Sequence, residues 1–191
     1  MINERGIWMS EDETGTHLCD KPLSDAIIEM FPVKSVIDIG CGNGQYTKNF
    51  LDVGIACEGY DGSPLTPEIT GGLCKIRDFT QPVYVGKFDL VLCLEVGEHI
   101  PAIYERQFFT NLCFAAKEWI CLSWGIMGQG GYGHINCHDN EYVINEMTVR
   151  GFAFDLEKSN HLRERSTLPW FENTTMVFRG YWDIKDFKRL I

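Results

Sequence analysis

Residues 36–44 read VIDIGCGNG, an apolar run that carries one carboxylate, Asp38, and ends in glycines at alternate positions. The segment that follows, from Gln45 to Val53, is compatible with a helix. Glycine tolerates positive φ and lets a ligand lie directly on the backbone. The free N–H groups at the start of the next helix then face that ligand. The stretch therefore predicts a strand, a ligand-binding glycine loop (residues 40–44) and a helix.

The spacing of the glycines indicates which ligand the loop binds. A dinucleotide fingerprint has the order G-x-G-x-x-G, whereas here Gly44 comes one residue early and Gln45 holds the expected place. The carboxylate of Asp38 also suits a ligand with an ammonium group better than a pyrophosphate. A nicotinamide oxidoreductase is therefore disfavoured. The pattern resembles the first motif of class I S-adenosylmethionine-dependent methyltransferases. The resemblance implies S-adenosylmethionine as cofactor, held by Asp38, Gly40, Cys41, Gly42, Asn43 and Gly44.

The composition is that of one soluble globular domain. The chain has 191 residues, of which 45% are hydrophobic and 23% charged, enough for a full core. The net charge of −10 argues against nonspecific binding to nucleic acid or to an anionic membrane, since both favour a basic face. Lys185, Lys188 and Arg189 are expected to form a solvated surface. No apolar run approaches the roughly 20 residues of a membrane span, and the first residues do not resemble a signal peptide.

The eight cysteines are scattered along the chain, several of them in apolar runs, and none forms a C-x-x-C pair. This usage is typical of reduced, buried thiols rather than of a disulfide framework. We therefore expect a cytoplasmic protein.

Short apolar runs alternate with helical stripes after an N-terminal helix over 21–31, which predicts a mostly parallel α/β sheet with helices on both faces. The expected fold is a single-domain, Rossmann-like, doubly wound sheet that closes with an antiparallel strand pair. We expect a polar, irregular arm over 1–20, a domain over 21–180 and a tail over 181–191. The expected strands are 36–39, 55–60, 74–77, 88–94 and 119–124, with the closing pair at 152–156 and 174–178 around an irregular insert. The further helices are 44–53, 101–117 and one from Asp139 or Asn140 to Gly151.

Ligands of such sheets bind beyond the carboxyl ends of the strands. After the second strand, Asp61-Gly62 supplies a carboxylate that can accept hydrogen bonds from both hydroxyls of a ribose. Asp-Gly is also a common turn dipeptide, but its offset of about 21 residues from the glycine loop favours the ribose role. By resemblance, Asp78 after the third strand would face the adenine amino group and Phe79 would border its ring. A polar loop beside a core aromatic is an equal alternative.

The fourth strand is followed by Glu95-Val96-Gly97-Glu98-His99. In a helical turn this E-x-x-E-H would place Glu95, Glu98 and His99 on one face, where like charges repel unless a cation or a proton relieves them. The motif is similar to one in ubiquinone-pathway O-methyltransferases and small-RNA 2′-O-methyltransferases, where it contributes to a divalent metal site. It also occurs in many methyltransferases without metal. By resemblance, Glu95 and Val96 also contact the cofactor.

A glycine-dense loop, residues 125–138, follows the fifth strand where the substrate should enter. By resemblance to the metal-dependent relatives, His134 would complete a divalent site (Mg, Mn or Zn) with Glu95, Glu98 and His99. The alternative is a surface loop with solvated histidines. His134, Cys137 and His138 alone would suggest zinc, but no second ligand pair accompanies them.

Several aromatic and imidazole side chains outside the motifs have two interpretations. His17 is expected either to close over the cofactor or to be a cap or surface residue. Trp8, Trp124 and Trp170 either shape a substrate pocket or pack in the core or a lid.

We therefore expect a methyltransferase that modifies a hydroxyl of a small molecule or sugar, with His99 first and His134 second as catalytic residues, because a hydroxyl nucleophile must lose its proton. The alternatives are an RNA 3′-end 2′-O-methyltransferase, which the acidity disfavours, and a non-catalytic cofactor-binding partner subunit. The acceptor's identity and the oligomeric state stay open.

Overall fold

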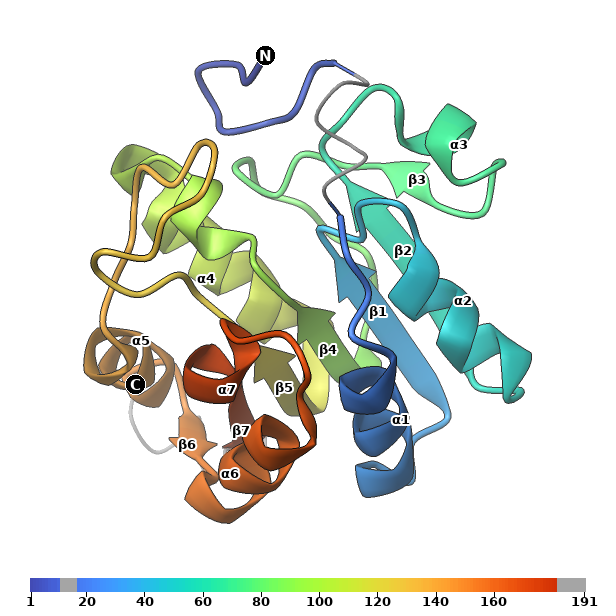
Figure 1. Cartoon of the computed structure of the whole chain (residues 1–191), viewed down its shortest axis with the longest axis vertical. Coiled ribbons are helices and arrows are strands. Elements are labelled where there is room, and N and C mark those ends of the chain that lie inside the picture. Colours follow the sequence, from blue (N-terminus) through green and yellow to red (C-terminus); the bar gives the residue numbers. More distant parts are fainter. Residues whose placement is uncertain (11–16, 182–191) are drawn as a thin grey trace.

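The computed structural model describes residues 1–10 and 17–181; Lys185, Lys188 and Arg189 lie outside them. A seven-stranded sheet in the order β3-β2-β1-β4-β5-β7-β6 forms the centre of the protein (Figure 1). β1 to β5 run parallel, whereas β7 is antiparallel to both β5 and β6. This confirms the expected Rossmann-like sheet with an antiparallel pair at its C-terminal end. The strands are β1 (Ser35–Ile39), β2 (Ala56–Asp61), β3 (Lys75–Ile76), β4 (Phe88–Cys93), β5 (Ala116–Leu122), β6 (Phe152–Phe154) and β7 (Met176–Gly180).

Helices cover both faces of the sheet and give three layers. One face packs against α1, α2, α6 and α7, and the other against α4 and α5. Successive residues of a strand point to opposite faces. In β4, Leu90 and Leu92 accordingly join the core on the α1 side of the sheet, and Val91 and Cys93 join the core on the α4 side. The helices are α1 (Lys21–Met30), α2 (Gln45–Asp52), α3 (Thr66–Ile69), α4 (Ala102–Ala115), α5 (Asn140–Thr148), α6 (Leu156–Arg165) and α7 (Phe171–Thr174), with a short 3-10 helix η2 (Gly97–His99).

The segment between β6 and β7 is not irregular, so that expectation is wrong. It contains α6, which the Asp155 side chain caps by accepting a hydrogen bond from the Lys158 N–H, and α7. α6 has the sequence LEKSNHLRER and buries only Leu162 among its apolar residues. Hydrophobic periodicity is too sparse to reveal such a helix. α3 and α7 have four residues each, which is too short for a periodic signal.

The buried carboxylate of Asp20 joins the start of α1 to the connection between α6 and α7. It accepts hydrogen bonds from Leu23 N, at 3.1 Å, and from Thr167 N and Leu168 N, at 2.7 and 2.8 Å. The bond from Leu23 satisfies a free N–H group at the start of α1. The bonds from Thr167 and Leu168 fix the stretch that leads to Trp170.

The first nine residues form a hairpin, where an irregular arm was expected. Ile2 and Trp8 pair in an antiparallel bridge, and the Asn3 side chain accepts hydrogen bonds from the N–H groups of Arg5 and Ile7. This N-terminal hairpin (residues 1–9) crosses the top of Figure 1, above the carboxyl ends of the central strands. It therefore lies where a ligand of the sheet is expected.

Within the described part of the chain, no helix combines the length and the apolar character that a bilayer span requires.

Candidate functional site

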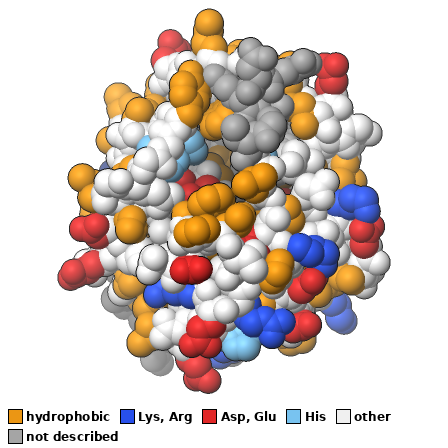
Figure 2. Space-filling view, viewed as in Figure 1, with side chains coloured by type: hydrophobic (Ala, Val, Ile, Leu, Met, Phe, Trp, Pro, Cys, Tyr) orange, Lys and Arg blue, Asp and Glu red, His pale blue; other side chains and the backbone are white. Residues whose placement is uncertain are grey.

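A cavity of about 420 Å³ opens at the carboxyl ends of β1, β2 and β4. Figure 2 shows a hollow on this face, with histidine side chains at one edge and hydrophobic side chains along another. The volume lies within the usual range for small-molecule sites. The cavity is lined by all the predicted cofactor residues except Gly44: Asp38, Gly40, Cys41, Gly42, Asn43, Asp61, Gly62, Asp78, Phe79, Glu95 and Val96.

The glycine loop requires glycine for reasons of both conformation and space. Gly40 and Gly42 have φ of 75° and 53°, which side chains rarely adopt. A Cβ on Gly40 would lie 2.2 Å from Cγ2 of Val96, and one on Gly42 would lie 2.4 Å from Nδ1 of His17. Gly44 begins α2 instead, with φ 75°. Val96 and His17 therefore pack directly on the loop, at positions where only glycine fits.

Asp38 lies at the base of the cavity and is almost completely buried. Its Oδ2 accepts a hydrogen bond of 2.7 Å from Thr47 Oγ1 of α2. Burial raises the pKa of Asp38 to about 6, because low dielectric disfavours the charged carboxylate. A ligand ammonium beside Asp38 would restore the charged form, which agrees with the role predicted from the sequence.

Asp61, at the end of β2, holds the glycine loop and also faces the cavity. Its Oδ2 accepts a hydrogen bond of 3.0 Å from Gly42 N, and its Oδ1 one of 2.8 Å from Ser63 N. A carboxylate has about four acceptor positions, so each oxygen keeps one for a ligand. Asp61 can therefore form its turn and accept from a vicinal diol at the same time.

Asp78 and Phe79 reach the cavity in different ways. Asp78 forms an ion pair of 2.7 Å with Arg5 of the N-terminal hairpin and accepts hydrogen bonds from Thr80. Phe79 is mostly buried and packs edge-on against Tyr60 at 6.3 Å. Phe79 is thus a core residue with one side on the cavity, and Asp78 is held by a partner 73 positions away.

Glu95 stands just before η2 in the left-handed conformation, with φ 55°. Its carboxylate accepts hydrogen bonds of 2.8 Å from Ser123 Oγ and from Gln129 Nε2. A positive φ is costly for a side chain other than glycine, and these contacts hold it. Glu95 therefore lines the cavity with both carboxylate oxygens engaged.

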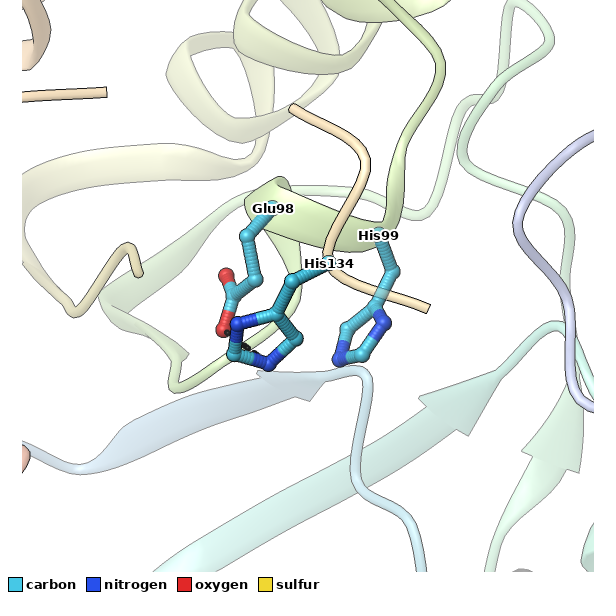
Figure 3. A group of neighbouring side chains, drawn as sticks. All are labelled: Glu98, His99 and His134. Carbon is cyan, nitrogen blue, oxygen red and sulfur yellow. Dashed lines mark ion pairs between the residues drawn. The ribbon is translucent and has the colours of Figure 1, made fainter. Parts of the chain in front are cut away.

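Glu98, His99 and His134 lie together, as Figure 3 shows. Glu98 and His99 come from η2 and His134 from the glycine-dense loop, and one ligand atom of each lies within 4.8 Å of the others. Glu98 is fully buried, and neither of its carboxylate oxygens has a hydrogen-bond partner among the described residues. Its nearest cationic candidate, Nε2 of His134, is 3.9 Å away. Of the four predicted metal ligands, the structure brings three together. Glu95 stands before the helical turn of η2 and does not join them.

The environment of these side chains shifts their protonation. Burial, and then the neighbouring charge of Glu95, raises the pKa of Glu98 well above its usual value. Burial, and then the nearby His134, lowers the pKa of His99 to about 4. Nδ1 of His99 is 3.1 Å from the carbonyl oxygen of Gly133. A carbonyl can only accept, so Nδ1 carries the proton and Nε2 keeps its lone pair. His99 is therefore a neutral imidazole that offers Nε2 to a ligand.

A second polar cluster fixes the far end of the glycine-dense loop. Glu105 of α4 accepts hydrogen bonds from Asn136 at 2.6 Å, from His138 at 2.8 Å and from Tyr142. The indole of Trp124 donates to the carbonyl of Asn136 at 2.7 Å. His138 is therefore a loop anchor and does not join the site with His134, which argues against the zinc interpretation.

The remaining candidates are divided between core and cavity. Trp8, Trp170 and His17 line the cavity, whereas Trp124 is buried and stacks on Phe109 at 5.1 Å. Burial lowers the pKa of His17. Sequence reasoning missed Arg5, Ile7 and Ser63, since no local pattern marks them, and Gln129, whose only signal was its place in the glycine-dense loop.

Comparisons with known proteins agree with this geometry. Residues 14–118 match the family described as "Methyltransferase domain". A probable chloroplastic tocopherol O-methyltransferase of Oryza sativa subsp. japonica is 33% identical over 96 residues. That match covers 44% of this chain and 26% of the rice protein. The chain thus spans about a quarter of the curated relative's length.

Solved structures show the same fold at low identity. Magnesium protoporphyrin IX methyltransferase from Synechocystis PCC 6803, determined with bound SAH, has a TM-score of 0.62 at 17% identity, covering 84% of this chain and 80% of that one. An S-adenosylmethionine-dependent methyltransferase from Clostridium acetobutylicum has a TM-score of 0.67 at 14% identity, covering 87% and 94%. The chain therefore shares its overall fold with these proteins.

Proposed function

Because the chain belongs to the methyltransferase-domain family and has the class I S-adenosylmethionine-dependent methyltransferase fold, we propose that it is an enzyme that methylates a hydroxyl group of a small molecule. One observation carries the choice of a hydroxyl: the neutral imidazole of His99 presents Nε2 at the cavity that the glycine loop lines. An amine acceptor would need less help from a base. The rice relative, an O-methyltransferase by name, supports the same choice.

The donor S-adenosylmethionine supplies a methyl group on a positively charged sulfur. Three features of this chain suit that donor. Gly40 and Gly42 line the cavity with backbone alone, Asp61 offers acceptors to the ribose hydroxyls, and Asp38 suits the ammonium. Asp38, Asp61 and Glu95 also make the lining acidic, which favours a cation.

The residues act mainly by alignment and by accepting one proton. Methyl transfer is an in-line displacement, so holding both reactants in register lowers its barrier by several kcal/mol. Nε2 of His99 takes the proton of the acceptor hydroxyl as the bond to carbon forms. The Gly133 carbonyl fixes the ring orientation that this step requires.

Two measurements test the proposal. Calorimetry should show binding of S-adenosylhomocysteine and none of NAD. Wild-type protein with S-adenosylmethionine and a hydroxyl acceptor should release S-adenosylhomocysteine, and His99→Gln should reduce that rate by about 100-fold, within the range for general acid–base catalysis. Binding of NAD would overturn the assignment of S-adenosylmethionine as the donor. A His99→Gln rate equal to that of the wild type would overturn the role of His99 as the base. Turnover of a 2′-hydroxyl at an RNA 3′ end would favour the alternative substrate, and binding without any turnover a non-catalytic partner subunit.

A divalent cation is the alternative to a free imidazole base, since Nε2 of His99 has a single lone pair, and the unpartnered carboxylate of Glu98 supports it. Buried charges are normally paired or coordinate metals, and one carboxylate with two imidazoles suits Mn²⁺ or Zn²⁺ better than Mg²⁺. Glu98, His99 and His134 would hold the ion, which would lower the pKa of an acceptor hydroxyl.

Metal content and stability test the cation without relying on turnover. We expect the wild type to bind Mn²⁺ or Zn²⁺ in equilibrium dialysis and to melt at a higher temperature with it. Glu98→Gln should lose both effects. If neither ion binds, or if chelator leaves turnover unchanged, His99 acts as a base alone and Glu98 is a buried neutral acid.

We also propose that the protein acts in the cytoplasm on a soluble acceptor, without nucleic acid. Its reduced cysteines and net charge of −10 support this.

A further inference from the structure

The N-terminal hairpin is a built wall of the cavity. Gly6 packs so closely on η2 that a Cβ there would lie 1.9 Å from the carbonyl oxygen of His99. The Ile7 side chain packs on Gly62, where a Cβ would lie 2.9 Å from it. The Ile2 side chain packs on Gly133, where a Cβ would lie 2.2 Å from it. The hairpin therefore packs against both ends of the cavity.

Trp8 of this hairpin lies at the centre of a group of four rings beside the proposed base. Its ring centroid is 5.7 Å from that of His99, 5.0 Å from that of His17 and 6.0 Å from that of Tyr132. The three partner rings stand at 64° to 80° to the indole. Aromatic pairs favour such edge-to-face or offset arrangements. The acceptor end of the cavity is thus a corner of aromatic surfaces.

The charges that line the cavity restrict the acceptor further. Among the described residues that line it, Arg77 is the only lysine or arginine. It follows β3 on the donor side, where its N–H donates to the Asp61 carbonyl. The guanidinium of Arg5 is already paired with Asp78. A phosphate or carboxylate on the acceptor would therefore meet carboxylates and no lysine or arginine of the described lining at the aromatic corner.

The side-chain amide beside this corner, that of Gln129, is already hydrogen-bonded. Gln129 donates to Glu95 and accepts from the Ile126 N–H, so it is engaged. The several hydroxyls of a sugar would each need a partner in this confined space, and a buried hydroxyl without one is costly. A planar ring with one reacting hydroxyl has no such requirement.

We propose that Trp8 is the positioning residue for the acceptor, and that the acceptor is an uncharged aromatic compound with a phenolic hydroxyl. This rests on the proposed function. The ring lies against the indole and directs its hydroxyl to Nε2 of His99. A phenol has a pKa of about 10, like a tyrosine side chain, so it gives its proton to an imidazole far more readily than an aliphatic alcohol does.

The reaction balances without a further reactant. The phenolic O–H bond breaks and its proton goes to Nε2 of His99, while a bond forms between the oxygen and the methyl carbon. The bond from that carbon to sulfur breaks, and sulfur keeps the electron pair as a neutral thioether.

The test compares catechol with cyclohexane-1,2-diol, which has the same ring size and vicinal hydroxyls but is neither aromatic nor planar. Hydroquinone and myo-inositol form a second pair. S-Adenosylhomocysteine release is measured for the wild type, Trp8→Leu and Trp8→Phe. Tyr84→Leu is the control, because Tyr84 is exposed and lies outside the cavity lining. Circular dichroism checks that each variant folds.

We expect the wild type to methylate the phenols at least 10-fold faster than the matched alcohols. Trp8→Leu should raise KM for catechol about 10-fold while changing kcat and the Kd of S-adenosylhomocysteine less than twofold. Trp8→Phe should recover most of the loss. Equal rates for the alcohols, no turnover of either phenol, or an unchanged KM in a folded Trp8→Leu would overturn the proposal. If S-adenosylhomocysteine still binds, only the acceptor assignment fails; if it does not, the proposed function fails as well.

Discussion

Arg5 and Asp78 form an ion pair of 2.7 Å that fastens the N-terminal hairpin to the loop after β3. Both side chains are partly exposed, 38% and 25%, so solvent screens the pair and it adds little to the stability of the fold. Because the pair holds the hairpin against the cavity, its effect should instead appear in the rate at which a bound ligand dissociates.

Arg5→Ala should therefore leave the melting temperature nearly unchanged but speed the dissociation of S-adenosylhomocysteine severalfold, measured by stopped-flow fluorescence. Lys21→Ala, which removes an exposed pair with Asp25 on α1, serves as the control and should not alter the rate. An unchanged dissociation rate for Arg5→Ala would show that the hairpin does not limit release.

Gly42→Val should abolish binding of S-adenosylhomocysteine in calorimetry. Its φ of 53° disfavours any side chain, and a Cβ would lie 2.4 Å from Nδ1 of His17. Gly54→Ala provides a matched control, because Gly54 also has a positive φ, of 83°, but open space around it. If Gly42→Val binds as well as Gly54→Ala does, the glycine loop is not the donor site.

Asp61→Ala should weaken S-adenosylhomocysteine binding by about 1–3 kcal/mol, because the ribose hydroxyls and the N–H of Gly42 lose their acceptor. Asp52→Ala, which removes an exposed carboxylate paired with Lys48 on α2, should leave the Kd unchanged. Calorimetry measures both constants. Equal affinities would make Asp61 a turn residue only.

The affinity for S-adenosylhomocysteine should rise with pH from 5 to 7 and then level off. The free protein holds the pKa of Asp38 at about 6, whereas the ammonium of the ligand favours the ionised carboxylate, so binding below pH 6 releases a proton. Asp38→Asn should bind more weakly and lose this dependence. Titrations in two buffers of different ionisation enthalpy measure the released proton, and its absence would contradict the assignment.

The raised pKa of Asp38 changes the stability of the free protein in the opposite direction, because this contribution falls as the pH rises. A folded pKa of about 6 exceeds the unfolded value of about 3.9, so folding favours protonated Asp38. This contribution is complete below about pH 4 and is lost as the pH rises to about 6.

Features encoded by neighbouring residues could be predicted from the sequence. The strand, glycine loop and helix around residue 42 follow from local composition, and Asp38 and Asp61 follow from the strand ends. The position of His134 followed from the loop after β5 together with the family resemblance. Asp38, Asp61 and His134 all line the cavity.

Features that depend on distant pairs could not be predicted. Arg5 meets Asp78 across 73 positions, and Gln129 meets Glu95 across 34. No periodic pattern encodes such contacts. The hairpin was hidden for the same reason, because the Asn3 side chain and the packing of Gly6 on His99 stabilise it, rather than an alternation of apolar residues.

Asp20 ties the start of α1 to the stretch that carries Trp170. The two sides of the cavity are built from different parts of the chain. The donor side comes from β1, β2 and their loops, whereas the hairpin, the glycine-dense loop and the residues around Trp170 face it. An engineer could graft these facing segments from a relative to redirect the choice of acceptor. The donor half would keep its own sequence throughout such an exchange.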